Sequence, residues 1–166
     1  MCEQFDMDML VIYGMIAGLV STVVMTFVEI LSWRKWHLYG VFEWHENQVI
    51  TRKLFSISND EKESIHIKGI FLFHFLNGNL VGIAFPFIIT SLFPSFTNDI
   101  GSLLLLGILY GFIVWIVTLI PIHKPITGLS PWNHPLGKWP AVASLGGHIV
   151  YGFILGLIIF TFFNVF

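Results

Sequence analysis

Four apolar stretches, each long enough to cross a bilayer, constrain this 166-residue chain more than any other feature. A helix needs roughly 20 predominantly apolar residues to span the hydrocarbon core. Since lipid offers the backbone no hydrogen-bonding partner, each stretch is expected to be an α-helix. The sequence therefore predicts an all-α fold, a polytopic membrane protein built as a bundle of four transmembrane helices. The predicted spans cover about residues 9–33, 69–93, 100–121 and 141–166.

Composition agrees with a single four-helix transmembrane domain over residues 1–166. The chain is 55% hydrophobic and only 11% charged, whereas soluble domains carry about 25% charged residues. A net charge of −2 provides no basic surface for nucleic acid. The single Cys2 cannot form an internal disulfide or a cysteine-rich metal site. The residues before the first span are acidic, so we expect this span to be retained rather than cleaved as a signal peptide.

The eight Lys and Arg residues lie in only two of the connections between the spans. Those in the first connection are Arg34, Lys35, Arg52, Lys53, Lys62 and Lys68, and those in the third are Lys124 and Lys138. Basic residues favour the cytoplasmic side of a membrane. The pattern predicts a multi-pass protein of the cell membrane, with both termini outside and both basic connections in the cytoplasm.

The first connection, residues 34–68, is rich in Trp and Tyr, which favour the headgroup layer. We therefore expect a cytoplasmic interfacial segment that lies on the membrane surface. Its polar set, His37, Glu43, His45 and Glu46, matches no metal-binding motif and is expected to be solvated. The sequence also lacks a phosphate loop, a nucleophile elbow and a Cys-x-x-Cys pair, so no catalytic residue is predicted and an enzyme acting on its own is not favoured.

Each predicted span carries a Gly-x-x-x-Gly pair. Two glycines four residues apart share one face of a helix and let a neighbouring backbone approach closely. Such a pair in every span predicts a compact bundle, although the glycines could instead seat a partner helix or a flat cofactor. The pairs are Gly14/Gly18, Gly78/Gly82, Gly107/Gly111 and Gly152/Gly156.

Three ionisable side chains, Glu29, His74 and His148, lie inside the predicted spans. Ionisable groups in the bilayer are costly and are therefore candidates for function. At about 1.5 Å per residue they lie about 6, 7 and 10 Å from the cytoplasmic ends of their helices, and His123 reaches a similar level. All are expected to point inward and to form one polar layer. Polar neighbours on the same helix faces are Asn77, Ser144 and Tyr151.

Several chemistries could use such a layer. Glu29, His74 and His148 are ligand types suited to a transition metal. Two opposed imidazoles could ligate a b-type haem, for which the glycines would leave room. A Glu–His chain could also relay a proton. In the simplest interpretation no cofactor is bound and each ring hydrogen-bonds a neighbour, so the sequence leaves the cofactor open.

Two short strings stand in the first and last spans: Ala17-Gly18-x-x-x-Thr22-x-x-Met25 and Gly147-His148-x-x-Tyr151-Gly152-x-x-x-Gly156. They resemble strings found in a family of small four-helix prokaryotic membrane proteins of uncharacterised function. The resemblance covers the four spans and is loose in the 34–68 connection. It implies the four-helix architecture and a fixed role for His148, and it implies no substrate.

These features favour a non-catalytic accessory or assembly subunit of a larger membrane complex, with the lipid bilayer and other membrane subunits as partners. The sequence has no soluble catalytic domain and no evident line of charges across the membrane. An alternative is a haem- or metal-binding electron-transfer protein that uses the Glu/His layer. A third possibility is a small transporter or channel, which would need a polar path to the outer side.

Overall fold

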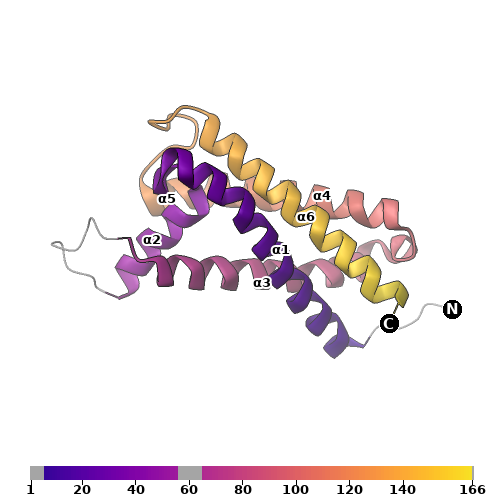
Figure 1. Cartoon of the computed structure of the whole chain (residues 1–166). Coiled ribbons are helices and arrows are strands. Elements are labelled where there is room, and N and C mark those ends of the chain that lie inside the picture. Colours follow the sequence, from indigo (N-terminus) through magenta and orange to yellow (C-terminus); the bar gives the residue numbers. More distant parts are fainter. Residues whose placement is uncertain (1–5, 56–64, 166) are drawn as a thin grey trace.

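The computed structural model describes residues 6–55 and 65–165, so Cys2 and Lys62 lie outside the described residues. In these residues every regular element is helical, and four helices are long and apolar enough to cross a membrane. The prediction of an all-α polytopic bundle is therefore confirmed (Figure 1). The spanning helices are α1 (Met7–Trp36), α3 (Ile67–Leu92), α4 (Ile100–Val117), which the π-helical turn η4 (Thr118–His123) and α5 (Lys124–Thr127) continue, and α6 (Trp139–Val165).

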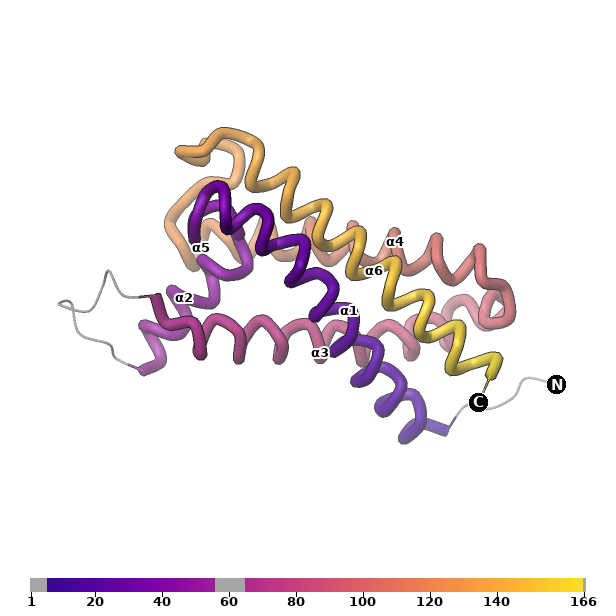
Figure 2. The backbone as a smooth tube through the Cα atoms, viewed as in Figure 1, coloured from indigo at the N-terminus to yellow at the C-terminus, as the bar shows by residue number. Residues whose placement is uncertain are grey.

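The spanning helices pack in the order α3, α1, α6, α4. Extensive contacts join α1 to both α3 and α6, and α6 to α4. The first turn of α1 and the last turn of α6 lie at one end of the bundle, which we call the terminal end (Figure 2). The short helices α2 and α5 lie at the opposite end, which we call the α2 end. The turn η3 (Pro94–Phe96) joins α3 to α4 at the terminal end.

Helix α1 extends past the predicted end at residue 33 and stops at Trp36. Arg34 and Lys35 therefore stand in its last turn, where positive charge complements the partial negative charge of a helix C-terminus. Their long side chains also let the charged groups reach the membrane surface. The chain then turns at His37, which has a positive φ of 54°.

The third span continues beyond Pro121, where the sequence predicts its end. Proline lacks a backbone N–H and interrupts an α-helix. Here Pro121 lies within η4, and the wider π-helical turn accommodates the interruption without ending the span. The turn also places His123 in the interior, where its side chain is fully buried.

The described part of the connection between α1 and α3 contains one helix that enters the interior of the bundle. It contains η1 (Leu38–Gly40) and α2 (Phe42–Leu54). Helix α2 packs against α3 inside the α2 end of the bundle. His45 and Glu46 are buried and Glu43 is only partly exposed, so the predicted solvated surface set is wrong for these three residues. Only His37 of that set is exposed.

A helix as polar as α2 is buried because the neighbouring helices provide hydrogen-bonding partners. The Trp44 indole Nε1 donates to Oε2 of Glu29 at 2.8 Å. The Asn47 amide donates to the carbonyl oxygen of Ile70 at 3.3 Å. Burial of a polar group is costly mainly when its hydrogen bonds are lost. The polar face of α2 is therefore part of the interior of the bundle.

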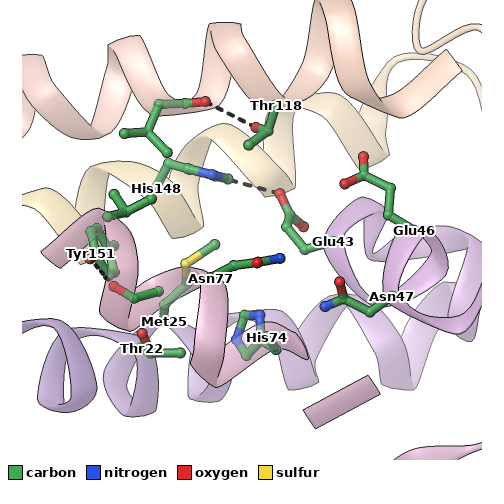
Figure 3. A pocket seen from close by; sticks show the side chains of 13 residues that line it. Thr22, Met25, Glu43, Glu46, Asn47, His74, Asn77, Thr118, His148 and Tyr151 are labelled. Atoms are coloured by element: carbon green, nitrogen blue, oxygen red, sulfur yellow. Dashed lines mark hydrogen bonds and ion pairs between the residues drawn. The ribbon is translucent and has the colours of Figure 1, made fainter. Parts of the chain in front are cut away.

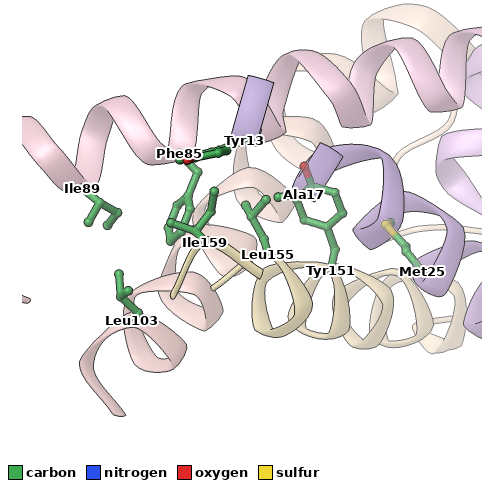
Figure 4. Close-up of a cluster of buried hydrophobic side chains, with 9 residues drawn as sticks. All are labelled: Tyr13, Ala17, Met25, Phe85, Ile89, Leu103, Tyr151, Leu155 and Ile159. Atoms are coloured by element: carbon green, nitrogen blue, oxygen red, sulfur yellow. The ribbon is translucent and has the colours of Figure 1, made fainter. Parts of the chain in front are cut away.

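The terminal half of the bundle has an apolar core. Its members come from all four spanning helices and interlock around α6 (Figure 4). They are Tyr13, Ala17, Met25, Phe85, Ile89, Leu103, Tyr151, Leu155 and Ile159. The Tyr13 ring also stacks on Phe162, with 4.4 Å between ring centroids. This half of the molecule is closed by close-packed apolar side chains.

The eight paired glycines lie at two helix crossings, α1 with α3 and α4 with α6. At the first crossing, a Cβ atom placed on Gly82 would lie closer than 3.0 Å to the Cα of Gly18. At the second, a Cβ atom on Gly152 would lie closer than 3.0 Å to the carbonyl oxygen of Gly107. Real Cβ atoms essentially never make contacts this short. Only glycine permits the two backbones to approach so closely at these positions.

For the other four paired glycines, the nearest residue on the neighbouring helix is not a glycine. The Gly-x-x-x-Gly spacing did not predict this difference. Gly111 of α4 faces the turn of α6 before Gly152, where a Cβ atom would clash with the carbonyl oxygen of His148. At the α1–α3 crossing, Gly78 faces the side chain of Thr22 rather than a backbone. Gly14 faces the backbone of Ile83, and Gly156 faces that of Leu103. Gly111 therefore lies at the helix turn that carries a predicted site residue.

Candidate functional site: a buried carboxylate–histidine layer

Three carboxylates meet three histidines in the α2 half of the bundle. The pairs are Glu29–His74, Glu43–His148 and Glu46–His123. The carboxylates come from α1 and α2, and the histidines come from α3, α6 and η4, so five elements contribute to the layer. The three histidines are buried, as are two of the carboxylates. We call these six residues the Glu–His layer.

The first pair joins α1 to α3. Oε2 of Glu29 lies 3.1 Å from Nε2 of His74 and also accepts the hydrogen bond from Trp44. The same imidazole nitrogen lies 3.1 Å from the hydroxyl of Thr26. That hydroxyl already donates to the carbonyl oxygen of Thr22 at 2.7 Å, so it must accept from His74. Nε2 of His74 therefore carries a proton that faces both the hydroxyl and the carboxylate.

The second pair joins α2 to α6. Nδ1 of His148 lies 3.0 Å from the carbonyl oxygen of Ser144 and 3.5 Å from Oε1 of Glu43. A carbonyl oxygen can only accept, so Nδ1 of His148 carries a proton. The Ser144 hydroxyl donates to the same carboxylate oxygen. Glu43 thus accepts one hydrogen bond from Ser144 and lies within ion-pair distance of His148, both on one turn of α6.

The third pair joins α2 to the π-helical turn. Oε1 of Glu46 lies 2.8 Å from Nδ1 of His123, whose ring packs on Phe42 with 4.2 Å between centroids. Burial, with a smaller contribution from Glu43, raises the pKa of Glu46 to about 9. On the preceding position of α2, burial and the neighbouring His123 lower the pKa of His45 to about 4. Glu46 is therefore protonated and His45 neutral near pH 7.

A small cavity of about 80 Å³ lies between these groups. His74, His148, Glu43 and Glu46 contribute to its lining (Figure 3). The remaining lining is Thr22, Met25, Asn47, Asn77, Gly78, Val81, Val114, Thr118 and Tyr151. Oε2 of Glu43 is buried without a hydrogen-bonding partner within the described residues. A water molecule needs about 10–15 Å³ and two or more polar partners, so the cavity suits a few waters or a small polar ligand.

The cavity reaches the molecular surface between α3 and α4. Asn77 of α3 lines the cavity and is nevertheless exposed. It lies ten residues into α3, which is about 15 Å along the helix axis and near the middle of a membrane. Val114 of α4 and Thr118 of η4 form the facing wall and are half-buried. The polar side chain of Asn77 is therefore exposed at a level near the middle of the membrane.

The structure brings Glu29 and His74 into contact and places His148 on the same cavity, paired with Glu43. Of the predicted supporting residues, His123 and Ser144 contact the α2 carboxylates, and Asn77 and Tyr151 line the cavity. The Tyr151 hydroxyl donates to the carbonyl oxygen of Gly78 at 2.7 Å. The roles of Glu43 and Glu46 were not predicted from the sequence. Their spacing of three residues, which puts both on one face of a helix, was the available signal.

Two cofactor interpretations can be compared with this geometry. In the described part of the chain, no three His, Cys, Asp or Glu side chains come together as a metal-binding group. The metal set Glu29, His74 and His148 therefore stays a prediction that requires rearrangement. Pockets for drug-sized ligands measure about 300–1,000 Å³. A cavity of about 80 Å³ is too small for a haem.

The fold and this layer define a multi-pass membrane protein with a polar cavity in one half of its helical bundle. We call this cavity the polar chamber. The chain belongs to a family of unknown function, DUF6789, whose model matches residues 9–164. Neither the comparison with curated proteins nor the comparison with solved structures found a match. Membership of this family therefore indicates no activity. The function must be inferred from the residues of the site.

Proposed function

We propose that this protein is an accessory membrane subunit that takes up and releases protons through its Glu–His layer. The observation that carries the proposal is the charge of the layer. In the described residues, the ion-pair partner of each layer carboxylate is a histidine rather than Lys or Arg. Three carboxylates beside three neutral imidazoles would leave three negative charges, two of them buried and one partly exposed, which is unfavourable. One bound proton per pair neutralises the layer.

The apolar core limits where these protons can go. Phe85, Leu155 and Ile159 are fully buried in the terminal half and fill the interior between the layer and that end. A proton or ion crosses such packing only with great difficulty. Exchange through the α2 end, where η1, α2 and α5 lie, is therefore favoured over transport across the membrane.

The role as a subunit rests on the exposed Asn77. A primary amide facing lipid loses its hydrogen bonds, which costs free energy. A helix of another membrane protein that covers the α3–α4 opening would supply a partner for the amide and would close the cavity. A photo-crosslinking residue at position 77 should therefore label a protein in the native membrane, whereas one at the exposed Leu72 should label lipid. Labelling of lipid alone from both positions would contradict the subunit role.

Infrared pH titration of the purified protein tests the proton-binding role. We expect the spectrum at neutral pH to contain a protonated carboxyl band that Glu46→Gln removes, because the pKa of Glu46 is about 9. The control is Asp8→Asn, which changes an exposed carboxylate at the start of α1. Fully ionised carboxyl groups at pH 7, with the same proton uptake by the wild type and Glu46→Gln between pH 6 and 10, would overturn the proposal.

A further inference from the structure

A second cavity lies at the α2 end, apart from the polar chamber. It has a volume of about 250 Å³ and is enclosed by α1, η1, α2 and the first turns of α3. Its walls are apolar side chains: Ile30, Trp33, Leu38, Trp44, Ile70 and Phe71. Several of these form a second hydrophobic cluster around Val41, Trp44 and Ile70. We call this cavity the apolar slot.

The apolar slot is unsuited to water. A buried water needs two to four polar partners, and Arg34 is the one charged residue among the described residues that line the slot. An empty void of this size also departs from the close packing of protein interiors, because the lining atoms lose their dispersion contacts. In a bilayer, the apolar material next to the ends of α1 and α3 is the acyl chains of lipid.

We propose that the apolar slot binds one acyl chain of an anionic phospholipid, with the lipid phosphate at the guanidinium of Arg34. Arg34 is exposed at the end of α1, and no carboxylate of the described residues lies within ion-pair distance of it. A guanidinium pairs with phosphate through two parallel hydrogen bonds. The neighbouring Trp33 also lines the slot, and indole rings favour the headgroup level of a membrane. The positive charge of Arg34 thus suits the lipid phosphate, and the apolar slot suits an acyl chain of the same lipid molecule.

The lipid would contact the wall that the slot shares with the Glu–His layer. The Trp44 ring forms part of the slot, and its indole N–H donates to Glu29. An acyl chain packed against this ring holds the indole in the orientation that the hydrogen bond needs. The bound lipid therefore supports the donor geometry around Glu29 without entering the polar chamber.

Lipid retention measured by native mass spectrometry tests the proposal. The delipidated protein is mixed with dioleoyl phosphatidylglycerol or with dioleoyl phosphatidylcholine, which carry the same chains. We expect the wild type to retain the anionic lipid more strongly, and Arg34→Gln to weaken that retention about fivefold, the effect of one basic residue near the membrane surface. The matched control is Lys35→Gln, since Lys35 lies over the Trp36 ring at 4.6 Å and is not part of the slot.

A variant that fills the slot distinguishes the contribution of the acyl chain to lipid binding from that of the headgroup. Ile30→Trp adds volume to the slot and keeps Arg34, so it should lose the retained lipid of either headgroup while its melting temperature shows that the fold persists. Equal retention of the two lipids by the wild type would overturn the proposal. So would equal effects of Arg34→Gln and Lys35→Gln, or unchanged retention in a folded Ile30→Trp variant.

Discussion

At the scale of single residues, Glu29 shows how a carboxylate is accommodated in the membrane interior. Its Oε2 atom has two N–H groups nearby, the Trp44 indole at 2.8 Å and His74 at 3.1 Å. Hydrogen bonds to a charged group are stronger than those between neutral groups. The carboxylate therefore depends on side chains from α2 and α3, and loss of either donor leaves it partly unsatisfied.

Replacement of the indole tests this dependence. Trp44→Phe keeps an aromatic ring and removes the N–H, so the free energy of unfolding should fall by about 1–3 kcal/mol, the cost of a buried group without its partner. Chemical denaturation in detergent measures the change. Trp132→Phe, at a residue that is 62% exposed, should stay close to the wild type. An equal effect of the two substitutions would argue against the role of the hydrogen bond.

The raised pKa of Glu46 predicts how stability depends on pH. An ordinary Glu releases its proton near pH 4.5, whereas Glu46 in the fold holds its proton up to about pH 9. Its contribution is complete below pH 4.5 and is lost as the pH rises toward 9. The lowered pKa of His45, about 4, acts in the opposite direction only below about pH 6.5.

The effect of Glu46 is therefore measured without that of His45 between pH 6.5 and 9. We expect the melting temperature of the wild type to fall across this range, because the free energy of unfolding decreases by up to about 1.4 kcal/mol per pH unit. Glu46→Gln cannot titrate and should show a flatter profile. If the two profiles are parallel, Glu46 does not hold the proton.

At the scale of elements, the helix crossings depend on which glycines face a neighbour. Within α6, Gly152 meets the backbone of α4 between Gly107 and Gly111, whereas a Cβ atom on Gly146 would meet nothing within 4 Å. Gly152 and Gly146 are thus two glycines of one helix, the first packed tightly against a neighbouring helix and the second with open space beside it. Sequence spacing separates them only because Gly152 belongs to a Gly-x-x-x-Gly pair.

Substitution at these positions should have opposite effects on stability. Gly152→Leu should lower the free energy of unfolding by about 1–3 kcal/mol, as overpacking of a tight contact does. Gly146→Leu should be neutral or slightly stabilising, because glycine is a poor helix former. Melting in detergent measures both variants. Unchanged melting of Gly152→Leu would mean that the α4–α6 crossing is loose.

At the scale of the whole molecule, the polar and apolar halves lie at opposite ends of one bundle. The helix ends next to the termini are at the apolar end, and the basic residues in the last turn of α1 and in α2 are at the other. From the positive-inside rule we predict that the α2 end faces the cytoplasm and that both termini lie outside. The Glu–His layer would exchange protons with the cytoplasm.

Cysteine labelling of sealed cells tests this orientation. In a Cys2→Ser background, an impermeant reagent should label Asn98→Cys, in the exposed α3–α4 turn, and should not label Trp132→Cys, in the connection before α6. Membrane disruption should make the second site reactive and serves as the control. Labelling of position 132 in intact cells would reverse the topology.

The four spans, the helix faces that carry glycine, and the shared depth of Glu29 and His74 follow from the sequence. These features are local, because they follow from the length of each apolar stretch and from the spacing along one helix. Only the packing of the helices shows that Gly111 faces the turn of His148, that α2 is largely buried and that His148 pairs with Glu43. The Ser144–Glu43 contact joins residues 101 positions apart. A polar helix has the same sequence pattern on a membrane surface and inside a bundle, and only the hydrogen-bonding partners on neighbouring helices make its burial favourable.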